Sequence, residues 1–270
     1  MKIKKYIASK TFLRKIFFPI FRKLDFYFLI VHPITFRPFF LKFWSHKGYW
    51  YYGKNREENE IALLKKLLKK GDKILEVGAH IGFMTQIFES LVTENGQVLA
   101  VEPSPINSKF LKLNTKTSTD ILPLALSDEI KKGYFYMDSY GGFTNSIKKD
   151  HAEERNIFFS KKQSSKVQPL TRIDVNIKTI DSICKEKKYK PNFIKIDVEG
   201  SEYNVIRGSL KTLEFVNIIM IEIRKDNLEL FELLESKNFI PLNENGEKIS
   251  YLEIDKSKFN NYFFIKAKDF

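Results

Sequence analysis

The sequence of 270 residues contains a single cysteine, Cys184, which excludes an intramolecular disulfide and a zinc cluster built from several cysteines. Such scarcity is typical of a reducing compartment, so we expect the cytoplasm. No run of 18 uncharged apolar residues occurs, and no membrane-spanning segment is therefore expected. A hydrophobic content of 43% with 14% aromatic residues excludes a disordered chain and predicts a full hydrophobic core.

Acidic residues are nearly absent from the first fifty positions. Asp25 stands alone there against eleven lysines and arginines, so this segment carries +10 of the net charge of +13. It also holds both tryptophans and thirteen Phe or Tyr residues. We consider three roles: a lid on the rest of the chain, short amphipathic helices on the inner face of an anionic membrane, or a nucleic-acid contact. Arg14-Lys15 and Arg22-Lys23 interrupt every apolar stretch, so a secretory signal is not expected.

From residue 57 onward, strand and helix patterns alternate. A helix over 57–70 stops at Gly71, and it is followed by strands and helices expected at 73–77, 83–92, 97–102, 105–114 and 120–125. Alternation of this kind is typical of βαβ units and predicts an α/β fold with a parallel sheet. Residues 147–166 carry many charges and few apolar anchors, which predicts a substrate loop or mobile lid. The other expected elements are strands at 134–137, 173–180, 192–197 and 217–222, helices at 181–188 and 228–237, and a terminal antiparallel pair formed by 249–254 and 261–266.

The densest motif is ILEVGAHIGFMT over residues 74–85. An apolar strand reaches Glu76, and a turn with Gly78 and Gly82 then leads into a helix, so that no Cβ obstructs a ligand near the helix N-terminus. The glycine spacing differs from the G-x-G-x-x-G of dinucleotide sites. Acid-x-Gly-x-x-x-Gly instead resembles motif I of the S-adenosylmethionine-dependent methyltransferases. A glycine turn that binds nothing is the structural alternative.

A second acid, Glu102, ends the next apolar strand, 26 residues after Glu76. Dinucleotide-type folds place a carboxylate that binds ribose hydroxyls about 20 residues after the glycine turn. Glu102 is therefore a candidate for this role, and an ordinary exposed carboxylate at a strand end is the alternative.

Three further carboxylates crowd the motif IKIDVEGSE over residues 194–202. Asp197, Glu199 and Glu202 follow a buried strand within six residues, and so many like charges are costly unless a cation, a hydroxyl or helix N–H groups satisfy them. For Glu202 the first turn of a helix capped by Ser201 is a sufficient structural explanation. For Asp197 and Glu199 we favour a functional role.

Six blocks in this order resemble the FkbM-type methyltransferases: ILEVGAHIGFMT (74–85), VEPSP (101–105), ALSD (125–128), TIDSI (179–183), IKIDVEGSE (194–202) and IMIEI (219–223). The resemblance implies a class I methyltransferase (Rossmann-like) fold. This is a seven-stranded, mostly parallel sheet with helices on both faces and an antiparallel hairpin strand at one edge. The resemblance covers about residues 55–265. We therefore divide the chain into a basic aromatic N-terminal extension with helices, 1–54, and a methyltransferase domain, 55–270.

The resemblance also implies S-adenosylmethionine as the cofactor and assigns site residues by position. Glu76, Gly78 and Gly82 would shape the pocket for its methionine end, with His80 where the family commonly has Asn. The remaining positions are Glu102 at the ribose, Ser127 and Asp128 beside the adenine, Asn145 and Ser146 in the acceptor loop, and Asp197 with Glu199 facing the sulfonium and the acceptor hydroxyl. Asp197 is the first candidate for the general base and Glu199 the second. A divalent cation bound to these two carboxylates is an open alternative.

From these expectations we predict an O-methyltransferase acting on a hydroxyl of a sugar, glycan or lipid-linked saccharide. One rival is a nucleic-acid methyltransferase, but the Asn/Asp-Pro-Pro-Tyr/Phe tetrapeptide that usually reads bases does not occur. The other rival is a non-catalytic, membrane-associated binding protein that keeps the fold. The departure at His80 leaves this second rival open.

Overall fold

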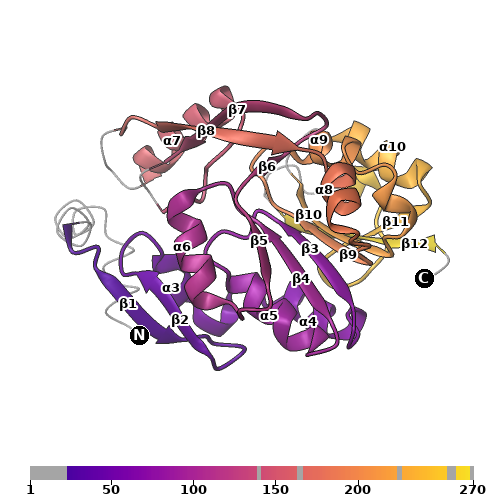
Figure 1. The fold of residues 1–270 in the computed structure, drawn as a ribbon, viewed down its shortest axis with the longest axis horizontal. Helices are drawn as coiled ribbons and strands as arrows, with labels where there is room; N and C mark the ends of the chain where they lie inside the picture. The colour runs from indigo at the N-terminus through magenta and orange to yellow at the C-terminus, as the bar shows by residue number, and fades with distance from the viewer. Residues whose placement is uncertain (1–22, 139–140, 163–166, 224–226, 254–259, 268–270) are drawn as a thin grey trace.

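A computed structural model describes residues 23–138, 141–162, 167–223, 227–253 and 260–267. Its centre is a seven-stranded sheet of order β11-β12-β10-β9-β3-β4-β5 (Figure 1). The strands are β3 (Lys73–Val77), β4 (Gln97–Val101), β5 (Asp120–Leu122), β9 (Phe193–Ile196), β10 (Ile218–Ile223), β11 (Phe239–Leu242) and β12 (Asn260–Lys266). The five from β5 to β10 are parallel, and β12 is antiparallel to both β10 and β11. The predicted α/β fold is confirmed.

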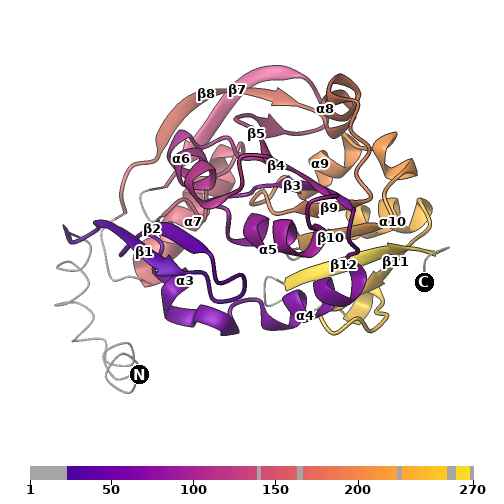
Figure 2. The same ribbon diagram turned by 60° about the horizontal axis from the view of Figure 1, so that its bottom comes forward.

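Helices cover both faces of this sheet (Figure 2). Side chains of α4 (Glu58–Leu67) and α5 (Phe83–Val92) share one hydrophobic core with one face, and those of α8 (Ile180–Lys187), α9 (Glu202–Arg207) and α10 (Leu228–Ser236) share a second core with the other. A further helix, α6 (Pro105–Asn114), follows β4. Three predicted elements, 73–77, 83–92 and 105–114, have the observed bounds, because each is an apolar run bounded by turn residues.

The predicted terminal pair is wrong in one strand. The partner of β12 is β11, which pairs Phe239 with Lys266 and Leu242 with Phe263. Residues 251–253 form a short 3₁₀ turn instead, in which Leu252 is exposed. Phe239 and Leu242 are buried, so the strand forms where apolar side chains reach the core, and its proline is tolerated in an edge strand.

A small second sheet of order β6-β8-β7 lies beside the main one. It consists of β6 (Ala125–Leu126), β7 (Lys131–Met137) and β8 (Thr171–Lys178). Between β7 and β8 lies α7 (Lys149–Lys162), so the loop or lid predicted at 147–166 is a helix in its described part. The buried residues of α7 are Ala152, Asn156 and Ser160, at every fourth position. Because these side chains are small or polar, the helix produces no apolar periodicity in the sequence.

The N-terminal extension is only partly helical in the part of the chain that is described. The hairpin of β1 (Tyr27–Val31) and β2 (Pro38–Lys42) replaces the expected helices there, and α3 (Lys47–Tyr52) follows it. Phe39 and Leu41 alternate into the core beside α5, which is the period-two pattern of a strand. The expectation for residues 1–22 lies outside the described residues.

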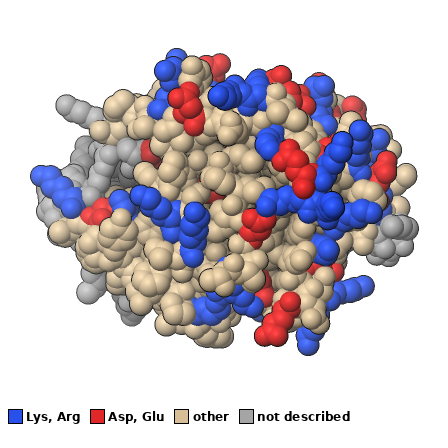
Figure 3. All heavy atoms as spheres, viewed as in Figure 1, with Lys and Arg blue, Asp and Glu red and all other residues tan. Residues whose placement is uncertain are grey.

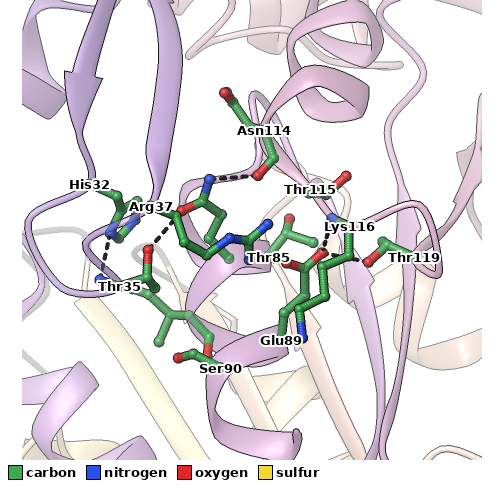
Figure 4. A network of polar contacts seen from close by, with 12 residues as sticks. His32, Thr35, Arg37, Thr85, Glu89, Ser90, Asn114, Thr115, Lys116 and Thr119 are labelled. Atoms are coloured by element: carbon green, nitrogen blue, oxygen red, sulfur yellow. Dashed lines mark hydrogen bonds and ion pairs between the residues drawn. The ribbon is translucent and has the colours of Figure 1, made fainter. Parts of the chain in front are cut away.

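Buried polar side chains join this hairpin to α5 and α6 (Figure 4). The Asn114 side chain donates to Phe40 O at 2.9 Å and accepts from Phe40 N at 2.6 Å. Gln86 accepts from the Thr35 hydroxyl at 2.7 Å, and Arg37 forms an ion pair with Glu89. Pairing buried backbone and carboxylate groups in this way fixes the hairpin as part of the domain core. Within the described ranges, no helix is both long and apolar enough to cross a bilayer.

Candidate active site

A cavity of about 760 Å³ lies beyond the carboxyl ends of β3, β4, β9 and β10, and its size falls within the usual range for small-molecule sites. Four parts of the chain line it: the strand ends of the main sheet, the edge of the small sheet with its following loop, residues 43–57 of the N-terminal segment, and helix α7 through Arg155 and Phe159. The predicted site residues that line it are Gly78, His80, Glu102, Asn145, Asp197 and Glu199.

Gly78 is the point of closest approach between two strand ends. Its φ is +84°, and a Cβ built there would overlap the carbonyl oxygen of Asp197. The absence of a side chain therefore lets the β3 turn contact the end of β9. The reason predicted for Gly82 needs correction: a Cβ there would lie 3.0 Å from Leu111 and 3.2 Å from Thr115, so this glycine permits packing against α6 rather than clearance for a ligand.

His80 joins the turn to two other segments. Its backbone N–H donates to Glu102 Oε2 at 2.9 Å, and its ring Nε2 lies 2.7 Å from the Gly141 carbonyl oxygen. A carbonyl only accepts, so Nε2 carries the proton and Nδ1 accepts from the Tyr49 hydroxyl at 2.8 Å. Burial lowers the pKa of His80 to about 4, so the ring is neutral near pH 7.

Glu102 is buried at the cavity wall. Besides His80 N, its carboxylate accepts from Ser104 N at 3.0 Å and from Asn107 Nδ2 at 3.2 Å. Burial raises its pKa to about 7. Hydroxyl donors of a ligand would add to these bonds and favour the ionised form.

Glu76 lies behind the turn rather than in the large cavity. It accepts from Thr85 Oγ1 at 2.6 Å, and burial raises its pKa to about 7. It lines a second cavity of about 40 Å³ that also touches Gly78, Lys195 and Asp197. Glu76 is thus placed to influence a bound ligand indirectly, through Gly78, Lys195 and Asp197, with which it lines this second cavity.

Three carboxylates, those of Asp197, Glu199 and Glu222, each offer an oxygen within 4.8 Å of the others. Lys195 Nζ lies 3.2 Å from Asp197 Oδ2. Burial, with the nearby Asp197 charge, raises the pKa of Glu222 well above its usual range. This arrangement could take up a proton, and its hard oxygen ligands would also suit a divalent cation. Sequence reasoning did not name Glu222 as a site residue, although it is the last residue but one of the apolar strand β10, and Glu102 similarly follows the end of β4.

Glu199 has basic partners of its own. His151 Nε2 lies 3.4 Å and Arg155 Nε 3.7 Å from Glu199 Oε2. The Glu199 backbone has a φ of +53°, and its carbonyl accepts from Ser146 Oγ at 2.9 Å. The two side chains hold the carboxylate of Glu199 in place, and the Ser146 hydroxyl holds its backbone carbonyl.

Residues 76–255 match the sequence model of the Methyltransferase FkbM domain, which is more than half of the chain. The chain belongs to the FkbM methyltransferase family. It is 25% identical over 171 residues to the hexuronic acid methyltransferase AglP of Haloferax volcanii, a match that covers 62% of this chain and 62% of that relative. The match thus spans less than two thirds of the length of AglP.

Solved methyltransferase structures are more distant from this FkbM protein. A protein titled as a putative rRNA methylase from Clostridium thermocellum has a TM-score of 0.43 at 14% identity, covering 77% of this chain and 94% of its own. Aeropyrum pernix fibrillarin, solved with bound S-adenosylmethionine, has a TM-score of 0.39 at 13% identity, covering 84% and 78%.

The positions taken from the FkbM resemblance differ in how they meet the cavity. Asn145 lines it, and the Ser146 hydroxyl donates to the backbone carbonyl of Glu199 at 2.9 Å, which links residue 146 to the loop after β9. Ser127 and Asp128 do not line it: Ser127 Oγ donates to Asp128 Oδ1 at 3.0 Å, and Asn204 of α9 donates to the same atom at 3.1 Å. The neighbouring cavity wall is formed by Leu124, Ala125 and Leu126.

Aromatic residues of the N-terminal segment also line the cavity, outside the range that matches the FkbM domain. Sequence reasoning offered a lid here but named none of them as site residues. The signal was the aromatic density of this segment, which does not by itself indicate which surface it contacts. They are Phe43, Trp44, Tyr49, Trp50, Tyr51 and Tyr52.

Proposed function

We propose that this protein is an S-adenosylmethionine-dependent O-methyltransferase acting on a hydroxyl of a sugar, glycan or lipid-linked saccharide. The observation that carries the proposal is the convergence of the Gly78 turn, Glu102 and Asp197 on one cavity in a chain of the FkbM family. The name of the relative AglP supports a saccharide acceptor. As part of the proposal, residues 55–270 are the methyltransferase domain and residues 1–54 an extension of it.

The cavity residues suit such a cofactor. Gly78 brings the turn after β3 to the cavity wall, and Glu102 offers carboxylate oxygens for ribose hydroxyls. Leu124 and Leu126 give an apolar surface suited to an adenine ring, next in sequence to Ser127 and Asp128. When bound, S-adenosylmethionine supplies a methyl group already activated by the sulfonium.

The chain then has to orient the acceptor oxygen, exclude water and remove a proton. Asp197 is proposed to accept the hydroxyl proton on its carboxylate as the oxygen–methyl bond forms. Lys195 Nζ, 3.2 Å away, holds the carboxylate in place. Glu199 is the weaker candidate for the base because the Arg155 guanidinium lies beside its carboxylate, which His151 also contacts. A divalent cation on Asp197, Glu199 and Glu222 is the alternative use of these groups.

Calorimetric titration with S-adenosylhomocysteine tests the cofactor half of the proposal. Glu102→Ala is expected to weaken binding by about 10- to 100-fold, because hydrogen bonds to a charged group contribute about 1.5–3 kcal/mol. Asp120→Ala is the matched control, since Asp120 begins β5 outside the cavity, where it pairs with Lys187, and its loss should leave the affinity unchanged. Absence of binding by the natural protein, or equal affinities of natural protein and Glu102→Ala, would refute the proposal.

We also propose a peripheral contact between the β1–β2 hairpin and an anionic membrane surface. Tyr27, Val31 and Phe36 are 74%, 65% and 79% exposed, in a segment that carries +10 of the net charge. Exposed apolar side chains in a segment of basic composition suit such a surface. Basic and acidic side chains are intermixed over the face drawn in Figure 3, whereas a nucleic acid would favour one basic tract.

Sedimentation with phosphatidylserine-containing vesicles tests the membrane contact. Phe36→Asn is expected to lower the partition constant about tenfold or more, since burying a Phe side chain contributes about 1.5–3 kcal/mol. The fold should tolerate this change, because Phe36 has a φ of +57° that Asn adopts more readily. The control variant is Ile130→Asn, which removes an apolar residue that is 65% exposed outside the hairpin. Ile130 precedes Lys131, which pairs with Ile177 at the end of the small sheet beside α8. Equal loss of binding in both variants would contradict a contact at the hairpin.

A further inference from the structure

The rim of the cavity contains two exposed tyrosines. Tyr51 and Tyr52 both line the cavity, and they are 40% and 59% exposed. Their rings lie 5.1 Å apart at 89°, so the pair presents a ring face and a ring edge at right angles. Large aromatic side chains left accessible beside a cavity indicate a surface that binds something.

We propose that Tyr51 and Tyr52 form an acceptor subsite that binds a saccharide ring, and that His80 positions the segment carrying them. This inference rests on the proposed methyltransferase function and assigns the acceptor a binding surface. A pyranose ring has C–H groups on its face and hydroxyls around its rim. The C–H face suits the electron-rich face of an aromatic ring, and the hydroxyls suit carboxylate and amide acceptors.

The same cavity supplies such acceptors. Asn145, Asp197 and Glu222 line it together with the two tyrosines. Aromatic rings and carboxylates in one cavity suit a sugar that stacks on the rings and offers a hydroxyl to Asp197. The distribution of polar and apolar groups therefore matches a saccharide.

The charge of the cavity lining favours a saccharide over a nucleic acid, whose bases also stack on aromatic rings. The cavity is lined by six carboxylate residues and three basic ones. Those carboxylates that are ionised repel phosphate groups. Glu102 and Glu222, whose pKa values are raised by burial, still accept hydrogen bonds from sugar hydroxyls when they are neutral. The carboxylates are Glu57, Glu102, Asp138, Asp197, Glu199 and Glu222, and the basic residues are Lys47, Arg56 and Arg155.

His80 determines where the tyrosine pair lies. Tyr49, in the same helix α3, donates its hydroxyl proton to His80 Nδ1 at 2.8 Å, and His80 Nε2 donates to Gly141 O at 2.7 Å. The imidazole also packs against Tyr49 and Phe143, with ring centroids 5.9 and 4.7 Å away, and these two rings lie 5.8 Å from each other. The neutral His80 ring thus links α3 and the loop at Gly141 to the turn that follows β3.

Transfer of label from S-[methyl-³H]adenosylmethionine to a cell-envelope saccharide fraction tests the subsite. For the double variant Y51A/Y52A the saccharide concentration at half-maximal rate should rise at least about fivefold, at an unchanged maximal rate, because each lost stacking contact contributes about 0.5–1.5 kcal/mol. The affinity for S-adenosylhomocysteine should not change. No transfer by the natural protein would refute the methyltransferase itself, whereas transfer with unchanged half-saturation would refute only the subsite. Label appearing in added oligo-dT instead of saccharide would also overturn it.

His80→Asn and Tyr49→Phe test the positioning role. Asn tolerates the φ of +51° and keeps the backbone bond to Glu102, but its side chain is too short to reach both Tyr49 and Gly141. Each variant should raise the half-saturating saccharide concentration about 2- to 10-fold, the effect of one lost hydrogen bond, while S-adenosylhomocysteine binds as before. The double variant should raise the half-saturating saccharide concentration no further than the more impaired of the two single variants, because both changes break the same Tyr49–His80 hydrogen bond. This role would be overturned if the effects of the two changes on the half-saturating saccharide concentration multiplied in the double variant. It would also be overturned if the variants lost affinity for S-adenosylhomocysteine while the half-saturating saccharide concentration stayed the same.

Discussion

Asp197→Asn is expected to lower the rate of methyl transfer about a hundredfold to ten-thousandfold, the usual contribution of a positioned general base, and to leave the affinity for S-adenosylhomocysteine within about twofold. The amide has the shape of the carboxylate and still accepts a hydrogen bond from Lys195, but it cannot take a proton from the acceptor hydroxyl. Asp197 suits this role because it reaches the cavity, with its side chain 38% exposed. Single-turnover transfer of labelled methyl, measured with saturating cofactor, separates this step from binding.

Glu199→Gln is the matched control for this experiment. Glu199 lies in the same acidic group, but its carboxylate is already engaged by the Arg155 guanidinium and by His151, so we expect a smaller loss of rate. Equal losses in the two variants, both restored by added magnesium, would assign the carboxylates to a cation instead. A natural protein that transfers no label at all would support the binding-module alternative.

Much of the fold could be predicted because its signals are local. Parallel strands are buried on both faces and therefore read as continuous apolar runs, such as 74–77 and 98–101, bounded by turn residues. The hairpin was missed because its basic and aromatic composition suggested membrane helices. The alternation of Phe39 and Leu41 becomes meaningful only when α5 and α6 are known to lie beside it. Helix α7 was missed for the opposite reason, since its buried positions are Ala152, Asn156 and Ser160.

The site divides in the same way. Glu102 and Asp197 follow from strand ends, because the carboxyl ends of parallel strands meet at one edge of the sheet. Glu222 required the strand order, in which β10 is the neighbour of β9. Tyr51 and Tyr52 required contacts between segments far apart in the chain, such as Tyr49 with His80. Sequence spacing does not encode contacts of this kind.

The turn that first indicated a cofactor site provides the strongest test of local geometry. Gly78→Ala is expected to lower the free energy of unfolding by about 2–5 kcal/mol, the sum of a left-handed alanine and an overpacked contact. The φ of +84° accounts for the first part, and overlap of the new Cβ with the Asp197 carbonyl oxygen for the second. Urea denaturation followed by circular dichroism measures the loss.

Gly71→Ala isolates the two causes. Gly71 has a φ of +90°, but a Cβ there would have nothing within 4 Å, so it should cost only the backbone part, about 1–2 kcal/mol. The difference between the two variants measures how closely the β3 turn approaches the end of β9. Because that approach also places the Asp197 carboxylate, Gly78→Ala should reduce cofactor affinity and transfer rate in the fraction that remains folded, and Gly71→Ala should reduce neither. Equal costs of the two substitutions would mean that the turn and the proposed base do not touch.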